Sequence, residues 1–319
     1  MFSALETSLS QSKFPIARYR FNFEVKESIN FADYAGSAIR GAFGHSLRRI
    51  SCMTHLKDCS ECPLKDTCPY LQIFEPPLPK KETIQKFSKI PVPYVIEAPN
   101  EQNFSYKPGD KFSFDLVLIG KALDFTALII FAMIKAMHRN IAKGSAEFVE
   151  VNYLDDNNSE FCIYNREMSQ IEEHDNCLKL NIFTKNQNVI LNFTTPLRIQ
   201  NNGRILTPSE YTPGILLMPL FRRVALLNDF FCKDKLDIPF KEIPQLFENI
   251  NLSATMVKKN WIRYSNRQKK HMNLGGYVGT VKLSNVPPLV LMFLKLGTYI
   301  HLGKNTSFGL GRFELLMLA

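Results

Sequence analysis

The sequence predicts an α+β fold made of two tandem ferredoxin-like (RRM-like) domains, with a cysteine-rich insertion in the first. Three observations favour this fold. The length of 319 residues suits two domains of about 150 residues each. Hydrophobic periodicity in the second half gives the order β-α-β-β-α-β, which is the split βαβ unit of that fold. The first half follows the same order if one of its strands lies within or after the insertion.

The first domain is expected over residues 1–157, with the insertion at about 51–109. Alternating apolar residues predict its strands, and Asn30 is a candidate N-cap before an apolar helix face. A polar run over residues 155–158 marks the domain boundary. The expected elements are, in order, a strand over 16–25, a helix over 31–50, a strand over 111–120, a helix over 124–142 and a strand over 146–153.

The second domain is expected over residues 158–319 and begins with a hairpin-like connector over 160–183. Its first helix carries Pro219 in its interior, so we expect a kink there. The further expected elements are a strand over 189–199, a helix over 209–231, strands over 253–264 and 274–283, a helix over 287–296 and a strand over 312–318.

The charged residues are distributed unevenly. The formal net charge is +9, from 39 Lys or Arg and 30 Asp or Glu. Residues 249–313 contain ten basic residues and no acidic one, which leaves the rest of the chain close to neutral. A segment whose charges are all positive raises the local electrostatic potential and attracts polyanions, above all nucleic acid. The alternative is a solvated face that acidic residues elsewhere in the fold balance.

The first half of this basic segment mixes cations with aromatic rings. Residues 258–270 hold six Lys or Arg together with Trp261 and Tyr264. Such a mixture suits single-stranded or stem–loop RNA, because bases stack on the rings while phosphates pair with the cations. The alternative is a solvated hairpin tip.

The second half of the basic segment is rich in glycine. Residues 297–315 contain Gly303, Gly309 and Gly311, with Lys304 and Arg312 beside them. Glycine lets a backbone approach a phosphate chain closely and present its N–H groups to it. The spacing matches neither a Walker A loop nor a dinucleotide-binding fingerprint. A plain turn is the alternative.

Four of the seven cysteines, Cys52, Cys59, Cys62 and Cys68, have the spacing C-x6-C-x2-C-x5-C. Four thiolates in this arrangement fit a structural zinc site, and an iron–sulfur cluster or no metal at all are the alternatives. A closed four-thiolate site has no open position for catalysis. The odd cysteine count and the absence of a secretory leader predict a cytoplasmic protein. No apolar run reaches the ~20 residues of a membrane span, so we expect no membrane partner.

Three segments resemble the CRISPR-associated repeat-processing endoribonucleases of the RAMP superfamily. They are Arg40–Glu75, which holds RGAFGHSLRRISC and the cysteines, Trp261–Val281 and the glycine-rich His301–Leu315. The resemblance implies two ferredoxin-like domains and a CRISPR repeat RNA as substrate. It also implies cleavage without a catalytic metal, in which the 2′-hydroxyl attacks the adjacent phosphate and leaves 2′,3′-cyclic phosphate and 5′-hydroxyl ends. The guide RNA product stays bound or passes to subunits of a CRISPR effector complex.

This reaction needs a base, an acid and a cation near the phosphate, and histidine titrates in the range suited to both proton transfers. The resemblance implies a base on the first helix, where many relatives keep a histidine, and this makes His45 the first candidate, with a capping or core histidine as the alternative. His301, Lys304 and Tyr34 are the other catalytic candidates, with a structural loop histidine as the alternative for His301. The RNA-binding candidates are Arg48, Arg49, Lys258, Lys259, Arg263, Arg267, Gln268, Lys269, Lys270, His271, Gly303, Asn305, Ser307, Gly309, Gly311 and Arg312.

Two other functions compete with the nuclease. A non-catalytic RAMP subunit that binds guide RNA in an effector complex would share the charge, the fold and the glycine loop. It would differ in needing no proton-transfer group beside the RNA. A zinc-containing nucleic-acid regulator is a third hypothesis, but the sequence has no helix-turn-helix pattern to support it.

Overall fold

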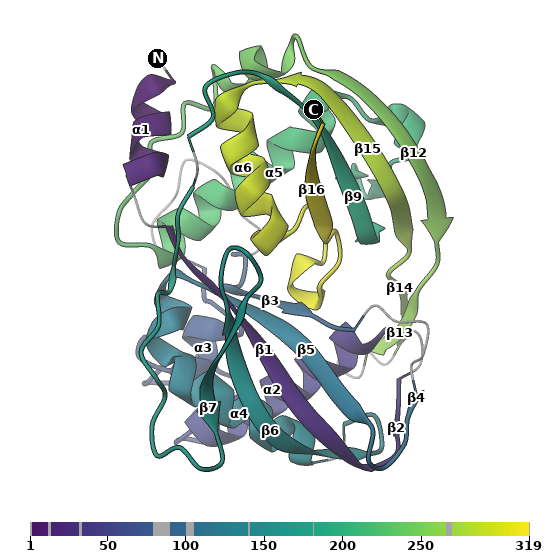
Figure 1. Cartoon of the computed structure of the whole chain (residues 1–319). Coiled ribbons are helices and arrows are strands. Elements are labelled where there is room, and N and C mark those ends of the chain that lie inside the picture. Colours follow the sequence, from purple (N-terminus) through teal and green to yellow (C-terminus); the bar gives the residue numbers. More distant parts are fainter. Residues whose placement is uncertain are drawn as a thin grey trace.

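The computed structural model describes residues 2–11, 14–31, 34–78, 90–99, 105–139, 141–180, 182–265 and 270–318, and for 262–265 and 270–272 it describes the backbone only. Two antiparallel sheets, each covered by helices, form the lower and upper halves of the molecule in Figure 1. Among the described residues, no helix has the length and apolar character needed to cross a membrane.

The N-terminal sheet has the strand order β3-β5-β1-β6-β7. Its first four strands and the two helices between them give the β-α-β-β-α-β order of a ferredoxin-like domain. The strand needed to complete that order is β3, which lies inside the expected insertion. The elements are β1 (Phe14–Glu27), α2 (Ala35–Ser51), β3 (Tyr94–Glu97), β5 (Lys111–Ile119), α4 (Thr126–His138) and β6 (Ser145–Leu154).

This domain extends beyond the expected boundary at residue 157. Strand β7 (Glu160–Asn165) pairs with β6, and β8 (Cys177–Leu178) pairs with the start of β1, so the expected connector belongs to the N-terminal sheet. Helix α2 begins after Tyr34 rather than after the expected N-cap Asn30. The smaller elements are β2 (Ile29–Asn30), α3 (Pro69–Ile73) and β4 (Ser105–Tyr106).

The C-terminal sheet repeats the plan with the strand order β12-β15-β9-β16. Helices α5 and α6 cover one face of it (Figure 1). Beyond β12 the chain continues into a short hairpin that points toward the N-terminal domain (Figure 1). The elements are β9 (Gln187–Leu197), α5 (Pro213–Phe231), β12 (Asn251–Lys259), β13 (Ile262–Ser265), β14 (Lys270–Asn273), β15 (Gly276–Val286), α6 (Pro288–Ile300) and β16 (Phe313–Leu318), with the small pair β10 (Gln200–Asn201) and β11 (Arg204–Ile205).

Each domain has its own apolar core, and each core includes side chains from the other half of the chain. Leu5 and Leu9 of the unexpected helix α1 (Ser3–Gln11) join the core of the C-terminal domain. In the opposite direction, Trp261 and Leu310 join the core of the N-terminal domain. The ring of Trp261 stacks on that of Tyr34 with centroids 4.3 Å apart. Aromatic pairs of this kind add to the burial of apolar surface, so the domains are held by shared cores.

The glycine-rich loop is part of this contact between the domains. Gly309 has φ +89°, and a β-carbon on it would collide with the Tyr34 hydroxyl and the Ile96 carbonyl. A β-carbon on Gly36 of α2 would likewise collide with the carbonyl of Phe308. The two backbones therefore approach each other as closely as they do only because these positions lack side chains.

This packing predicts the effect of Gly309→Ala. The substitution adds the cost of a positive φ to a collision at the domain contact, which together should lower the free energy of unfolding by roughly 2–5 kcal/mol. The matched control is Gly203→Ala, because Gly203 has φ +83° but open space around its Cα. The control should cost only about 1–2 kcal/mol. Urea unfolding of both variants measures the difference, and equal losses would contradict the proposed close contact.

Candidate functional site

His45 lies on the exposed face of α2 and lines two adjacent hollows. The first is a groove of about 620 Å³ between α2 and α4. Its cationic lining residues are Arg49 from α2 and Lys135 and Arg139 at the end of α4, and Phe131 adds an aromatic ring that is 45% exposed. The groove therefore places an imidazole beside three cations and an exposed ring.

The second hollow lies on the other side of His45, toward the end of α2. Besides His45 it is lined by Arg48, Arg49, His55 and Lys57, with Cys52 and Leu56. None of the described residues that line the two hollows is acidic. Together they form the basic groove around His45. Such a one-signed, concave surface attracts a phosphate backbone.

Local structure fixes the residues of this groove. His45 and Arg49 are four residues apart on α2, so their side chains lie on one helix face. Arg48 points toward the loop that follows the helix and donates from Nη2 to the carbonyls of Leu56 and Lys57, at 2.8 and 3.1 Å. Its guanidinium also lies 5.8 Å from the ring centroid of Tyr70. Arg48 therefore holds the loop in place, and Arg49 is the more exposed of the two cations.

The structure places His301 in the core and not in a groove with His45. Its side chain is fully buried, and Nε2 lies 2.8 Å from Oε1 of Glu97 in β3. Burial lowers the pKa of His301, and although Glu97 opposes this effect, the net shift is downward. The imidazole is therefore neutral near pH 7. The full burial of His301 and its pairing with Glu97 fit the structural alternative and not a catalytic group that contacts RNA.

Glu97 is the centre of this buried group. Arg18 of β1 approaches its carboxylate at 3.0 Å, and Arg312 approaches it from the C-terminal domain at 3.6 Å. Burial alone would raise the pKa of Glu97, but the two guanidinium groups and His301 outweigh it and lower the pKa. Arg18 also donates to the carbonyl of Thr298 at 2.8 Å. The candidate Arg312 thus pairs with a carboxylate in the domain contact.

Tyr34 is likewise a residue of the domain contact. It is 7% exposed, and its ring stacks on Trp261. Burial raises the pKa of its hydroxyl, so Tyr34 stays protonated and cannot serve as a base near neutral pH. The structure therefore shows Tyr34 as a packing residue of the domain contact, and a catalytic role for it stays a prediction.

The glycine-rich loop divides into a buried and an accessible part. Gly309 and Gly311 are buried, and the carbonyl of Gly309 accepts a hydrogen bond from Oγ1 of Thr195 at 2.8 Å. Gly309 serves the domain contact, whereas a β-carbon on Gly311 would collide with the carbonyl of Leu302 in its own domain. Neither buried glycine presents its backbone to a ligand. The candidates that keep solvent access are Gly303, Lys304, Asn305 and Ser307, of which Lys304 is exposed.

The basic hairpin is described only in part. Lys258 is exposed, whereas Lys259 is half-buried with Nζ 4.8 Å from the ring centroid of Trp261. The backbone of Arg263, Lys270 and His271 forms β13 and β14, and their side chains lie outside the described part of the structure. Arg267, Gln268 and Lys269 lie outside the described residues altogether. The RNA-binding role of these six residues stays a prediction.

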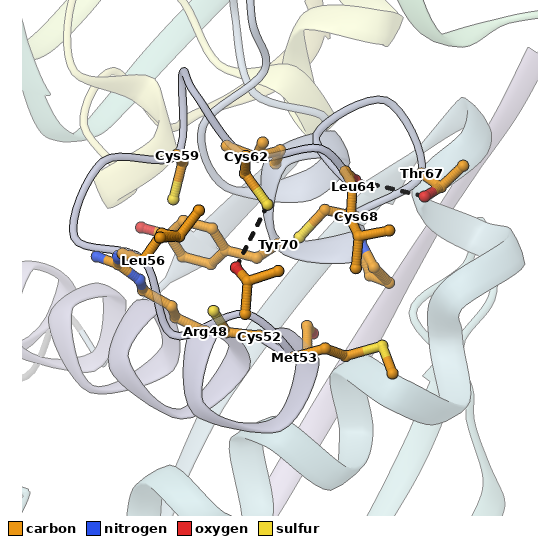
Figure 2. Close-up of a pocket in the computed structure, with 14 residues that line it drawn as sticks. Arg48, Cys52, Met53, Leu56, Cys59, Cys62, Leu64, Thr67, Cys68 and Tyr70 are labelled. Carbon is orange, nitrogen blue, oxygen red and sulfur yellow. Dashed lines mark hydrogen bonds between the residues drawn. The ribbon is translucent and has the colours of Figure 1, made fainter.

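The four candidate metal ligands come together at one pocket. Cys52, Cys59, Cys62 and Cys68 all line it, and Figure 2 shows their side chains around the same space. All four are free thiols. Over the residues that the structure describes, no three His, Cys, Asp or Glu side chains stand close enough together to hold a metal ion.

Sequence reasoning did not identify the α4 side of the groove or the loop residues His55 and Lys57. On α4, Phe131, Lys135 and Arg139 follow one another at intervals of four residues and thus share a helix face. The Lys135 ammonium lies 5.2 Å from the ring centroid of Phe131. This spacing was visible in the sequence, but its meaning depends on the packing of α4 beside α2.

Two family models match the chain. One described as an N-terminal domain matches residues 14–176, and one described as CRISPR-associated endoribonuclease Cas6 matches residues 191–313. No curated protein matches the chain significantly.

Solved structures have a similar fold. A structure described as a partial Cas6-RT-Cas1–Cas2 complex has a TM-score of 0.60 at 15% identity over 97% of this chain, which spans 47% of that one. A Cas6 product complex has a TM-score of 0.56 at 15% identity. The match covers 96% of this chain and 100% of the Cas6 chain. Cas6 of Thermus thermophilus has a TM-score of 0.50 at 13% identity, with coverage of 96% and 100%. At these identities the similarity shows the tandem ferredoxin-like fold. The chain spans about half the length of the first of these structures.

The buried pair of His301 and Glu97 predicts how stability depends on pH. His301 has a lowered pKa in the folded state, so below its ordinary value near 6.5 the unfolded chain binds more protons and stability falls. Glu97 has a lowered pKa as well, so its contribution is complete above its ordinary value of 4.5 and is lost as the pH falls further. Urea unfolding from pH 8 to pH 3 should show the first decline below about pH 6.5 and the second below about pH 4.5.

The variant His301→Gln tests the first decline, because glutamine retains a donor for Glu97 but does not titrate. Its stability should change less between pH 7 and pH 5 than that of the unmodified chain. His138→Gln is the control, since His138 is exposed at the end of α4. An unchanged pH dependence in His301→Gln would contradict the assignment.

Proposed function

We propose that this chain is a Cas6-type repeat-processing protein of the RAMP superfamily, an endoribonuclease that cleaves CRISPR precursor transcripts within the repeat; the match of residues 191–313 to the Cas6 family model supports this. The observation that carries the proposal is the exposed imidazole of His45 in a basic groove. A groove that only binds RNA needs cations and rings, whereas cleavage needs a group that transfers protons as well.

In the proposed reaction the RNA supplies its own nucleophile. The 2′-hydroxyl attacks the adjacent phosphorus, the bond to the 5′-oxygen breaks, and the products carry a 2′,3′-cyclic phosphate and a 5′-hydroxyl. His45 transfers a proton in this step, either from the 2′-hydroxyl or to the leaving oxygen. The nearby cations Arg49, Lys135 and Arg139 offset the charge that builds up on the phosphate. A nucleophile that belongs to the substrate requires no catalytic metal ion.

The rest of the chain would hold the RNA. Lys258, Lys304 and the predicted cations of the basic hairpin lie on the C-terminal domain, and they are proposed to contact the repeat backbone away from the cleaved bond. Partner subunits in a CRISPR complex are a further part of the proposal. The likeness to a structure described as a Cas6-RT-Cas1–Cas2 complex supports such an assembly.

His45→Ala tests the catalytic role. Loss of a positioned proton-transfer group should lower the cleavage rate of repeat RNA by about 10²–10⁴-fold, while the affinity for that RNA changes little. The measurement is single-turnover cleavage of the cognate repeat with excess EDTA added together with the RNA. The ends of the products are then analysed for cyclic phosphate.

His138→Ala is the matched control, because it removes an exposed histidine of α4 that does not line the groove. This control should cut at the unmodified rate. Tight binding of the repeat without any cutting by the unmodified chain would instead favour a non-catalytic guide-binding subunit. Cutting that depends on added metal ion would contradict the proposed chemistry.

The α4 side of the groove has its own test. The double variant Lys135→Ala with Arg139→Ala removes two phosphate contacts and should weaken RNA binding. The slope of log K plotted against log [salt] should become less steep by about 1.4 for single-stranded RNA. Fluorescence anisotropy with the repeat at several salt concentrations measures both quantities. Lys185→Ala, an exposed lysine in another part of the chain, serves as the control. A salt dependence equal to that of the unmodified chain would place the RNA elsewhere.

A further inference from the structure

We propose that Cys52, Cys59, Cys62 and Cys68 bind one zinc ion, and that this ion orders the loop that forms one wall of the basic groove around His45. Residues 52–68, between α2 and α3, are called the cysteine loop here. The metal part of the proposal is independent of the enzymatic activity, whereas the effect on the groove rests on the proposed function.

The cysteine loop has no apolar interior of its own. None of its 17 residues is fully buried, and none lies in a helix or strand. Its large apolar side chains line the same pocket as the cysteines but stay largely in solvent, since Met53 is 80% exposed, Leu56 44% and Leu64 40%. Six residues are half-buried, and four of these are the cysteines, with Thr54 and Lys65 as the other two. The side chains turned toward the inside of the loop are therefore mainly thiols.

A segment of this composition needs another source of order. Small units that cannot bury enough apolar surface are held by disulfides or by a structural metal. Zinc bound by four thiolates is a closed tetrahedral site, and such sites contribute directly to folding. The four cysteines of the loop form no disulfide in the structure, so no disulfide holds the loop.

The four thiols are placed where a shared ligand would be needed. They line one pocket of about 80 Å³, and three of them, Cys59, Cys62 and Cys68, come from a stretch of ten residues. The N–H of Cys62 donates to the carbonyl of Cys59 at 3.3 Å, which forms a tight turn across the C-x2-C pair. The sulfurs do not yet stand at ligand spacing. Metal binding would draw this loop of turns inward and would displace the hydrogen bond of 3.4 Å between Thr54 Oγ1 and Cys62 Sγ.

The cysteine loop is connected directly to the groove. Its carbonyls at Leu56 and Lys57 accept the hydrogen bonds of Arg48, one turn along α2 from His45. Two other loop side chains, His55 and Lys57, line the same hollow as His45. An ion that fixes the loop would thus fix the position of one wall without contacting the RNA.

Metal analysis of the full-length protein tests the proposal. Protein purified under reducing conditions without added metal should contain about one zinc per chain by inductively coupled plasma mass spectrometry. Cys59→Ser with Cys62→Ser should lose that zinc. Cys162→Ser is the control, because it removes an exposed thiol on β7, and it should retain the zinc. Zinc release with a mercurial reagent, followed by a colorimetric zinc indicator, gives a second measurement on the unmodified chain.

Any other metal content of the purified protein would overturn the proposal. Iron with acid-labile sulfide would replace zinc by a cluster, and free thiols without metal would leave the loop without any ion. A zinc content that persists in the double variant would place the ion elsewhere. Because metal content is measured without RNA, these outcomes do not depend on whether the chain cleaves the repeat. Loss of cleavage in His45→Ala in turn leaves the zinc content unaffected.

Discussion

The buried carboxylate of Glu97 is the interaction on which the arrangement of the two domains depends. It belongs to β3 of the N-terminal domain and is reached by Arg18 of the same sheet and by His301 and Arg312 of the other domain. A charge taken out of water costs several kcal/mol unless partners compensate for it. This carboxylate is therefore stable only while both domains keep their positions. Breaking such a group by removing one partner costs about 3–5 kcal/mol in other proteins.

This constraint explains the roles of the glycine-rich loop. The loop must deliver Arg312 to Glu97 and pass close to Tyr34, which leaves no room for a side chain at Gly309. Of the glycines that suggested a phosphate cradle, Gly309 is thus needed for the domain contact, whereas Gly303 and Gly311 are needed for close packing on Arg198 and Leu302 within the C-terminal domain. The exposed imidazole of His45 and the cations of the basic groove lie instead on the helical face of the N-terminal domain, where α2, α4 and the cysteine loop meet.

The sequence predicted the two ferredoxin-like units because their strands and helices have clear periods. It named His45 as a candidate through the resemblance of its helix, and the structure places that side chain in a basic groove. The sequence did not locate β3, since the four residues Tyr94–Glu97 are all buried and show no alternation. The burial of His301 was equally inaccessible, because its partner Glu97 lies 204 residues away in the chain. The α4 side of the groove required knowing which helix packs beside α2. Local patterns thus gave the elements and one residue, whereas the partners across the fold came from the tertiary structure.

The stack of Tyr34 on Trp261 has a consequence for how the molecule can change. Trp261 belongs to the C-terminal half of the chain but is only 4% exposed within the core of the N-terminal half. Conversely, Leu5 and Leu9 of the N-terminal half are buried in the core of the C-terminal half. Neither half would retain a sealed interior if it were produced alone or exchanged for that of a distant relative. The two repeats of one architecture are consequently not interchangeable modules, and we expect them to be inherited and to evolve as a single unit.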